Sequence, residues 1–543
     1  MTKYRIIRAL LQSVCLIAAA AGFHSCISVD GTLGEDFVPE DELLSIYVSD
    51  DIPIDEISLR LADSLSGYSS KHITFGSTKD ELFGVCNRGC ALTLIPLKDS
   101  VDFGKDPVFK KFTFKSTKDT ISYADDSQKN ILQNVFVYEL SHSIDSTTYD
   151  INRFPDVDRS RRVSRSIPVV GGNTDTLKFD FTKEFGEKYL STLASMKDED
   201  WSDIDKYLEK LPGIFIETDE AEDNGGRINM FNLQLGFNAS QGIINNDYAQ
   251  LDFTAEFDGR MVDTTCLFYF SPDRFYNIDS LLYYSSSGTL PQYCLNVASH
   301  SSVSMQGPAE EKIYMEGAGG ISPVIKAEVL KSLMEQEISK HGDPKKALIN
   351  KATLVFSYDA SDDFEELKNF PDIINPSVRV KNKSGTYSFS SLTGTASISR
   401  PMGAIDRSNM VYSPDISYHA QEILSLNEEN DDFSNYDVWF LIMHADIDVA
   451  SQSASEAAEQ EYYNQLMYAN YYNNLYSGYY NNSYNNYYNY MMYSNMYSSS
   501  SSSTYVSINL DKERYYKAVL NGPEAAEESK RPRLRFVYSL PNR

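Results

Sequence analysis

The chain has 543 residues, which is more than one compact core usually organises, so at least two packed units are expected. Acidic residues outnumber basic ones by 77 to 49, giving a formal net charge of −28 at pH 7. This charge disfavours a nucleic-acid partner, and it also disfavours binding of the protein surface itself to anionic lipid.

The first 26 residues predict a lipoprotein signal. Three basic residues precede an uncharged apolar run over residues 9–23, which is too short to span a membrane comfortably. The small Ser25 then precedes Cys26, whose thiol can accept diacylglycerol. We therefore predict that residues 1–25 are a signal peptide and that acyl chains such as palmitate anchor Cys26 in a membrane. Ordinary secretion with a free Cys26 is the alternative.

Residues 26–43 predict an acidic, polar tether between this anchor and the folded protein. Ile27 stands where inner-membrane lipoproteins usually carry Asp, which favours the outer membrane. An acidic lead-in of Asp30, Glu35 and Asp36 is typical of surface-exposed lipoproteins. We therefore predict a lipid-anchored outer-membrane protein at the cell surface, with ordered structure beginning near Leu44.

Beyond the tether, apolar and polar residues alternate in short segments bounded by Gly, Pro, Asn and Asp. This period of two predicts antiparallel strands. The expected strands cover residues 91–95, 111–115, 134–138, 233–237, 251–257, 267–270, 352–358, 438–443, 505–510 and 534–538. They predict a mainly β fold of one or two antiparallel β-sandwiches, with an N-terminal β-rich region at 44–300 and a C-terminal one at 301–543.

Apolar residues at helical spacing predict a few inserted helices. Two stripes lie within residues 183–211, and they comprise Phe185, Tyr189, Leu190 and Leu193, followed by Ile204, Tyr207, Leu208 and Leu211. A third helix is expected from about Pro323 to Ile338, ending before His341-Gly342. These helices should pack on the sheets as insertions.

Four cysteines lie beyond the anchor, namely Cys86, Cys90, Cys266 and Cys294. In an oxidising compartment they can pair. The spacing of the first two allows closure around a Gly-containing turn, and the last two flank a predicted hairpin, so two local disulfides are expected. Buried reduced thiols are the alternative. A zinc site is disfavoured, because no histidine lies near either pair at ligand spacing.

Two polar segments have competing interpretations. Arg159, Arg161, Arg162 and Arg165 form a basic island, which predicts an exposed loop or a docking patch. In His444-Ala-Asp446-Ile-Asp448 the three polar side chains would share one face of a strand and could ligate a metal. A solvated strand face is the preferred interpretation of that segment.

Residues 451–504 form a low-complexity insertion that contains a Tyr- and Asn-rich tract at 462–497. Such a sequence cannot build a specific apolar core, but its rings can stack on sugars or enter a protein groove. The candidate binding surface consists of Tyr479, Tyr480, Tyr487 and Tyr488. An idle loop expansion is the alternative. Because predicted strands flank the insertion, the fold should survive its deletion.

The common catalytic frames are missing from the sequence, including the GxSxG elbow, HExxH, the phosphate loop and GxGxxG. Gly317-Ala-Gly-Gly320 lacks the basic residue and the helix start that a phosphate cradle needs. We therefore predict a protein that is not an enzyme and has no catalytic residues, metal or cofactor.

Several motifs together resemble a family of large Bacteroidota lipoproteins known as a domain of unknown function. They are the lipobox with its acidic lead-in, Phe75-Gly76 to Phe83-Gly84, the helical pair before Leu211-Pro-Gly-Ile-Phe-Ile216, Ile313-Tyr-Met-Glu-Gly317-Ala-Gly-Gly320, Leu348-Ile-Asn-Lys-Ala-Thr-Leu-Val-Phe356 and Arg533-Leu-Arg-Phe-Val-Tyr538. The resemblance spans most of the mature chain and implies a β-rich, surface-facing outer-membrane lipoprotein. It supplies no catalytic residues, and the Tyr/Asn insertion departs from the family pattern.

These features predict a non-enzymatic binding or assembly protein that acts as a subunit of an envelope complex. Its expected partners are the membrane, through the N-terminal lipid, and an outer-membrane protein or a glycan. A glycan-binding surface module is the alternative function, and a surface hydrolase with a carboxylate pair is a third.

Overall fold

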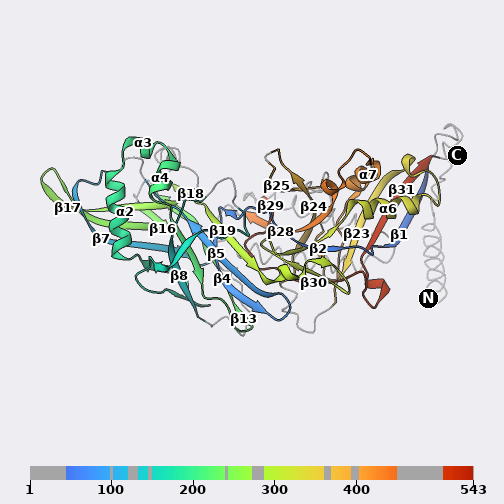
Figure 1. The fold of residues 1–543 in the computed structure, drawn as a ribbon, viewed down its shortest axis with the longest axis horizontal. Coiled ribbons are helices and arrows are strands. Elements are labelled where there is room, and N and C mark those ends of the chain that lie inside the picture. The colour runs from blue at the N-terminus through green and yellow to red at the C-terminus, as the bar shows by residue number, and fades with distance from the viewer. Residues whose placement is uncertain are drawn as a thin grey trace, which may run out of the picture.

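The structure is a computed structural model that describes residues 44–97, 102–119, 132–144, 150–238, 243–271, 275, 287–359, 369–383, 385–392, 403–427, 429–448 and 505–541. Its fold is mainly β, as the alternating sequence predicted, with antiparallel sheets of the β-sandwich type and few helices. The described part is elongated, with an N-terminal body at one end and a C-terminal body at the other (Figure 1). None of the helices in this part is both long and apolar enough to cross a membrane.

The N-terminal body contains two large sheets and a small one. The first sheet has the order β10 (Val169–Val170), β8 (Gln133–Leu140), β12 (Ile214–Thr218), β5 (Gly84–Leu92), β19 (Cys294–His300) and β3 (Tyr68–Ser69), with β9 (Val157–Arg162) on β8, and β4 (His72–Asp80) pairing β5 and β13 (Gly225–Asn232). The second has the order β11 (Thr176–Asp180), β7 (Lys105–Thr117), β16 (Tyr248–Phe257), β17 (Arg260–Phe270) and β6 (Leu94–Pro96). The small sheet has the order β15 (Ile243–Asn246), β14 (Gln234–Asn238) and β18 (Ser287–Pro291).

The predicted strand at 91–95 is divided between the two large sheets. β5 ends at Leu92 and pairs with β12 and β19, whereas β6 begins at Leu94 and pairs with β17. The chain therefore crosses from one sheet to the other at Thr93. Apolar side chains of both sheets then share one buried core, since Leu92 and Leu94 lie in the same cluster.

Helices α2 (Lys183–Ser195), α3 (Asp198–Trp201) and α4 (Ile204–Lys210) confirm the predicted helical insertion. The Thr182 hydroxyl accepts a hydrogen bond from the Phe185 amide at 3.3 Å and so caps α2. Phe185 and Tyr189 place their rings 6.1 and 5.4 Å from the ring of Phe112 on β7. The predicted stripe is thus the face that covers the second sheet.

The C-terminal body is built from three sheets. The first has the order β1 (Leu44–Pro53), β31 (Arg533–Pro541), β23 (Leu348–Ser357), β27 (Val411–Tyr412) and β26 (Ile405–Asp406). The second has the order β20 (Gly307–Pro308), β2 (Ser58–Leu61), β22 (Ile321–Ile325), β28 (Val438–Asp448), β24 (Ile373–Lys381) and β25 (Tyr387–Ser391), with β29 (Tyr505–Leu510) on β28. The third pairs β21 (Lys312–Glu316) with β30 (Lys517–Asn521).

Two longer helices and four 3-10 turns complete the described elements. They are α6 (Ala327–Ile338), α7 (Ser417–Ser425), η3 (Ser301–Met305), η4 (Pro344–Lys346), η6 (Phe433–Tyr436) and η7 (Glu528–Lys530). The predicted start of α6 at Pro323 is wrong, because Pro323 and Ile325 belong to β22, where Ile325 pairs with Val438. Helix α7 was not among the helices predicted from the sequence.

The first two strands belong to the C-terminal body, although the sequence pattern placed them in the region 44–300. β1 pairs with β31 from Leu44, opposite Pro541, to Pro53, opposite Arg533. β2 pairs with β22, and the residues after β1 enter the C-terminal core. β1 and β31 lie at the end of the molecule that points away from the N-terminal body (Figure 1).

Candidate functional site

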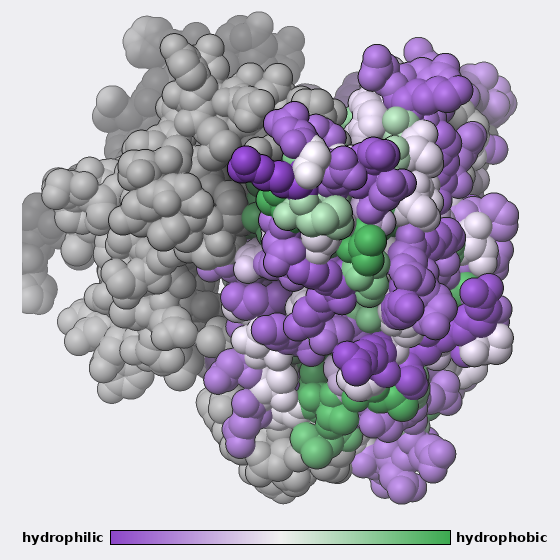
Figure 2. Space-filling view, turned by 90° about the vertical axis from the view of Figure 1, so that its left-hand side faces the viewer, coloured by the Kyte–Doolittle hydropathy of each residue, from purple (hydrophilic) through white to green (hydrophobic). Residues whose placement is uncertain are grey.

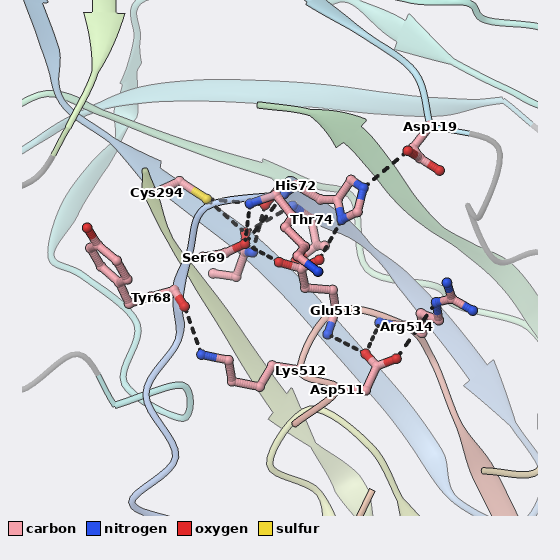
Figure 3. Close-up of polar contacts among 12 residues, drawn as sticks. Tyr68, Ser69, His72, Thr74, Asp119, Cys294, Asp511, Lys512, Glu513 and Arg514 are labelled. Carbon is pink, nitrogen blue, oxygen red and sulfur yellow. Dashed lines mark hydrogen bonds and ion pairs between the residues drawn. The ribbon is translucent and has the colours of Figure 1, made fainter. Parts of the chain in front are cut away.

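The two bodies meet where the segment between β29 and β30, residues 511–516, crosses the N-terminal sheet. We call it the junction segment. The Asp511 carboxylate accepts hydrogen bonds from the amides of Glu513 and Arg514 at 3.0 and 2.9 Å, which closes a tight turn. Figure 3 shows that Lys512 and Glu513 leave this turn toward different groups of the N-terminal body.

Glu513 forms the centre of a partly buried charge cluster at the start of β4. Its carboxylate accepts a hydrogen bond from the Ser69 hydroxyl and lies 2.5 Å from Nδ1 of His72. Nε2 of His72 in turn lies 3.1 Å from the Asp119 carboxylate. One imidazole therefore lies between two carboxylates (Figure 3).

The partners of His72 and Glu513 shift both pKa values toward the charged forms. Burial alone would lower the pKa of His72, but Asp119 and Glu513 raise it from 6.5 to about 9. Burial alone would raise the pKa of Glu513, but its hydrogen bond to His72 and the charge of His72 hold it below its ordinary value. At neutral pH the cluster therefore contains an imidazolium between carboxylates.

Two further cations connect the bodies through backbone carbonyls. Arg88, buried on β5, donates from Nη1 to the Glu513 carbonyl and from Nη2 to the Arg514 carbonyl, the latter at 3.1 Å. Lys512 donates to the carbonyl of Tyr68 at 2.7 Å. These bonds fix the backbone of the junction segment against the N-terminal sheet. Charged side chains therefore determine how the two bodies are held together at the junction.

Ser69 and His72 do not form a nucleophile and its base. The Ser69 hydroxyl donates to Glu513, and both nitrogens of His72 contact carboxylates, so no imidazole lone pair is directed at the hydroxyl. The arrangement can hold charge and position backbone, which is the chemistry of a structural clamp.

The structure contradicts both predicted disulfides, because Cys86, Cys90, Cys266 and Cys294 are free and buried. Cys86 and Cys90 are four residues apart within β5, where their Cα atoms are separated by about 13 Å, twice what a disulfide allows. Cys266 lies on β17 and Cys294 on β19, in different sheets. Burial, with the hydrogen bond and charge of Cys90, raises the pKa of the Cys294 thiol.

A second buried cluster lies beside the junction segment and contains Cys86, His300 and Glu316. Their ligand atoms all lie within 4.8 Å of one another, and all three residues are buried. Cys86 and His300 are direct neighbours across β5 and β19, and Glu316 ends β21. Burial lowers the pKa of His300, but the charges of Glu316 and Cys86 raise it by more, well above its ordinary value.

The strand predicted around His444 is present as β28, but His444 does not lie on a solvated face. It is only 8% exposed, and its Nδ1 lies 3.6 Å from the Asp372 carboxylate. Burial follows from its position in the second C-terminal sheet, where it is paired with Asn509. The side chains of Asp446 and Asp448 lie outside the described residues.

Three residues of the basic island, Arg159, Arg161 and Arg162, lie on an edge strand, β9, where the sequence predicted a loop, and Arg165 follows the strand. Its residues are mostly exposed, and Arg159 forms a two-point hydrogen bond to Glu217 at 2.7 and 3.0 Å. These two residues line a polar pocket of about 310 Å³ together with Glu220, which accepts a hydrogen bond from Asn87. The carboxylates of this pocket thus already have protein partners.

The lipid anchor Cys26 and the candidate binding tyrosines, Tyr479, Tyr480, Tyr487 and Tyr488, lie outside the described residues. The described elements nevertheless show where the Tyr/Asn insertion leaves the fold. β28 and β29 pair antiparallel up to Asp448 opposite Tyr505. The insertion therefore replaces the turn of a hairpin.

Neither buried cluster was predicted from the sequence. His72 and Glu513 are 441 residues apart, and Cys86 and His300 become neighbours only through the pairing of β5 with β19. One sequence signal could have indicated that His300 is buried, because it follows the mainly apolar segment 294–298. Neither a family model, nor a curated protein, nor a solved structure matches the chain.

Proposed function

We propose that this protein is a non-enzymatic, lipid-anchored outer-membrane protein that acts at the cell surface as a subunit of an envelope complex. The lipobox at Cys26 supports the anchor, and the acidic tether supports surface exposure. The resemblance to large Bacteroidota lipoproteins supports the same location. The exposed apolar face of β1 is the observation that supports a protein partner.

β1 is the edge strand of its described sheet and turns alternate side chains in opposite directions. Tyr47 points inward, because its ring stacks at 4.3 Å on His341 and at 5.4 Å on Tyr538. Leu44, Ile46 and Val48 are 51%, 67% and 62% exposed. Three exposed apolar side chains in one row on an edge strand favour association with another protein.

The position of this strand determines which kind of partner it meets. The tether that begins at Cys26 ends at Leu44, so β1 is the part of the fold nearest to the lipid anchor along the chain. This position favours a partner that is itself held in the membrane. An outer-membrane protein that covers the β1 face satisfies both the position and the apolar chemistry.

The opposite end of the molecule has a different surface. Viewed from the N-terminal body, the described surface is mainly hydrophilic and carries small hydrophobic areas (Figure 2). Met261 on β17 is one exposed apolar residue of that body, at 60% exposure. It provides a control of matched chemistry at the end of the described part opposite to β1 (Figure 1).

The experiment is purification of the tagged chain from membranes in mild detergent, followed by mass spectrometry of the proteins that accompany it. A discrete outer-membrane protein should accompany the wild type and be lost from Ile46→Asp. Met261→Asp should retain it. A partner retained by Ile46→Asp, or a wild type that carries no partner, would contradict the proposal.

Glycan binding is the competing function, and it depends on the Tyr/Asn tract at 462–497. Binding of purified polysaccharide to the isolated protein, lost when residues 451–504 are deleted but unchanged by Ile46→Asp, would favour the glycan module over the complex subunit.

A further inference from the structure

A buried set of possible ligands joins the two bodies independently of the proposed partner surface. Cys86 comes from β5 and His300 from β19, both in the N-terminal body. Glu316 comes from β21, whose apolar residues belong to the C-terminal core. β5 and β19 are neighbours in one sheet and β21 belongs to another, so the three side chains converge on one point from paired strands.

Hydrogen bonds outside the cluster orient two of the three side chains. Nε2 of His300 lies 3.0 Å from the Ala318 carbonyl, so this nitrogen carries a proton, and loss of the proton on Nδ1 would direct the Nδ1 lone pair at the cluster. The Ser302 hydroxyl donates to Oε2 of Glu316 and leaves Oε1 for the same ligand. Backbone carbonyls and hydroxyls hold metal-binding imidazoles and carboxylates in this way.

The two remaining atoms face each other at a distance that requires a proton or a metal cation between them. Nδ1 of His300 and Oε1 of Glu316 lie 3.1 Å apart as an ion pair, and both side chains are fully buried. Two adjacent ligands of a tetrahedral zinc ion lie roughly 3.3 Å apart, given bond lengths of about 2.0–2.1 Å. The thiol of Cys86 completes a triangle of ligand atoms within 4.8 Å.

We propose that Cys86, His300 and Glu316 bind a zinc ion that links the N-terminal body to the C-terminal body. A thiolate, an imidazole and a carboxylate are the ligand types that zinc accepts together. Binding releases the thiol proton of Cys86, and any proton on Nδ1 of His300, to solvent. A water molecule or another group completes the fourth position.

A shared proton or a catalytic role would account for less of this geometry. A proton between His300 and Glu316 would satisfy those two atoms, and the thiol of Cys86 hydrogen-bonds to His300. A metal ion would contact the ligand atoms of all three residues at once. A catalytic Cys–His–Glu arrangement would need substrate access, yet the side chains of His300 and Glu316 are 0% exposed. Full burial leaves a bound metal ion no access to substrate, so its role here would be to hold the two bodies together.

The test uses the full chain, purified without chelator and analysed for metals by mass spectrometry. About one zinc per chain is expected, and Cys86→Ser and Glu316→Gln should lose it. Cys266→Ser removes a buried cysteine elsewhere in the N-terminal body and should retain it. A zinc content unchanged by Cys86→Ser would overturn the proposal.

A measurement on the wild type covers the case in which the variants do not fold. Replacing the bound metal with Co²⁺ should produce a thiolate-to-cobalt charge-transfer band in the near ultraviolet. Strong chelation should lower the melting temperature. The proposal would be overturned if the zinc-supplemented wild type held no metal, showed no such band with Co²⁺ and melted at the same temperature with chelator. That result would establish a hydrogen-bonded pair of His300 and Glu316 instead.

Discussion

At the scale of single residues, one histidine shared by two carboxylates controls how the junction responds to pH. The folded-state pKa of His72 is about 9 against 6.5 in the unfolded chain, so its stabilising contribution is complete below pH 6.5 and is lost as the pH rises through 9. The free energy of unfolding should therefore fall over this interval by up to roughly 3 kcal/mol.

Denaturant unfolding at a series of pH values measures this loss, with His72→Gln as the test and His142→Gln, an exposed histidine of the same body, as the control. The His72 variant should be less stable at pH 6.5 and should lose less stability between pH 6.5 and 9 than the wild type. The control should follow the wild type. Parallel curves for all three proteins would show that His72 does not couple the junction to pH.

Arg88 makes the second prediction at this scale. Its guanidinium serves two carbonyls of the junction segment, and a lysine cannot reach both. Arg88→Lys should lower the free energy of unfolding by about 1–3 kcal/mol, because a buried carbonyl loses its donor. Arg159→Lys changes an exposed pair and should lower it by about 0–1 kcal/mol. Equal losses in denaturant unfolding would show that the junction bonds add nothing.

The residues of both buried clusters could not be predicted as clusters from the sequence. The alternating pattern predicted their strands, but pairing of β5 with β19, and docking of residues 511–516 on β4, depend on contacts between distant segments. The prediction of disulfides was wrong for a related reason. Their spacing favoured a disulfide, and the extension of β5 through both Cys86 and Cys90 excluded it.

At the scale of elements, β28 and β29 determine what the Tyr/Asn insertion can contribute to the fold. Asp448 and Tyr505 face each other at the last pair of the hairpin. Deletion of residues 451–504 leaves two residues between these strands, which is the length of a tight hairpin turn. The fold does not need the insertion to bring its flanking strands together.

Deleting residues 451–504, with Asn-Gly in place of Val449-Ala450, should therefore leave the melting temperature almost unchanged. Circular dichroism during heating measures this. The deletion should also remove glycan or partner binding if the tract is the contact surface, which a pull-down measures. A chain that no longer folds would show that the tract is part of a sheet or core.

Elements with strong local patterns were the predictable part of this fold. Phe185 and Tyr189 repeat at helical spacing and lie on one face of α2, and the strands β7 and β16 alternate as expected. The predicted ends of elements were wrong where pairing with a distant strand determined the secondary structure. Ile325 fits the apolar stripe of α6, but its pairing with Val438 places it in β22.

At the scale of the whole molecule, the proposed lipid anchor lies outside the body that the structure describes. The first described strand, β1, begins at Leu44 and is paired within that body, so loss of the anchor should leave the body intact. Cys26→Ala should leave an unprocessed precursor or release soluble protein, as membrane fractionation and mass determination would show. Cys15→Ala, within the apolar run, should remain processed and membrane-bound. Unchanged processing of Cys26→Ala would remove the basis for the anchor.

The pairing of β1 with β31 also explains why the domain organisation could be predicted only partly from the sequence. No local pattern indicates that Leu44 lies opposite Pro541. Because of this pairing, the first described strand lies on the C-terminal body, and the N-terminal body extends away from it (Figure 1). With the proposed anchor at Cys26, the proposed partner surface on β1 would lie at the membrane-proximal end.

The most direct test of the proposed partner surface is photo-crosslinking in living cells from a reactive amino acid at position 46, compared with the same group at position 261. We predict that a group in place of Ile46 crosslinks to a discrete outer-membrane protein and that one in place of Met261 does not. Crosslinking to that protein from position 261 alone, or no protein crosslink from position 46, would contradict the proposal.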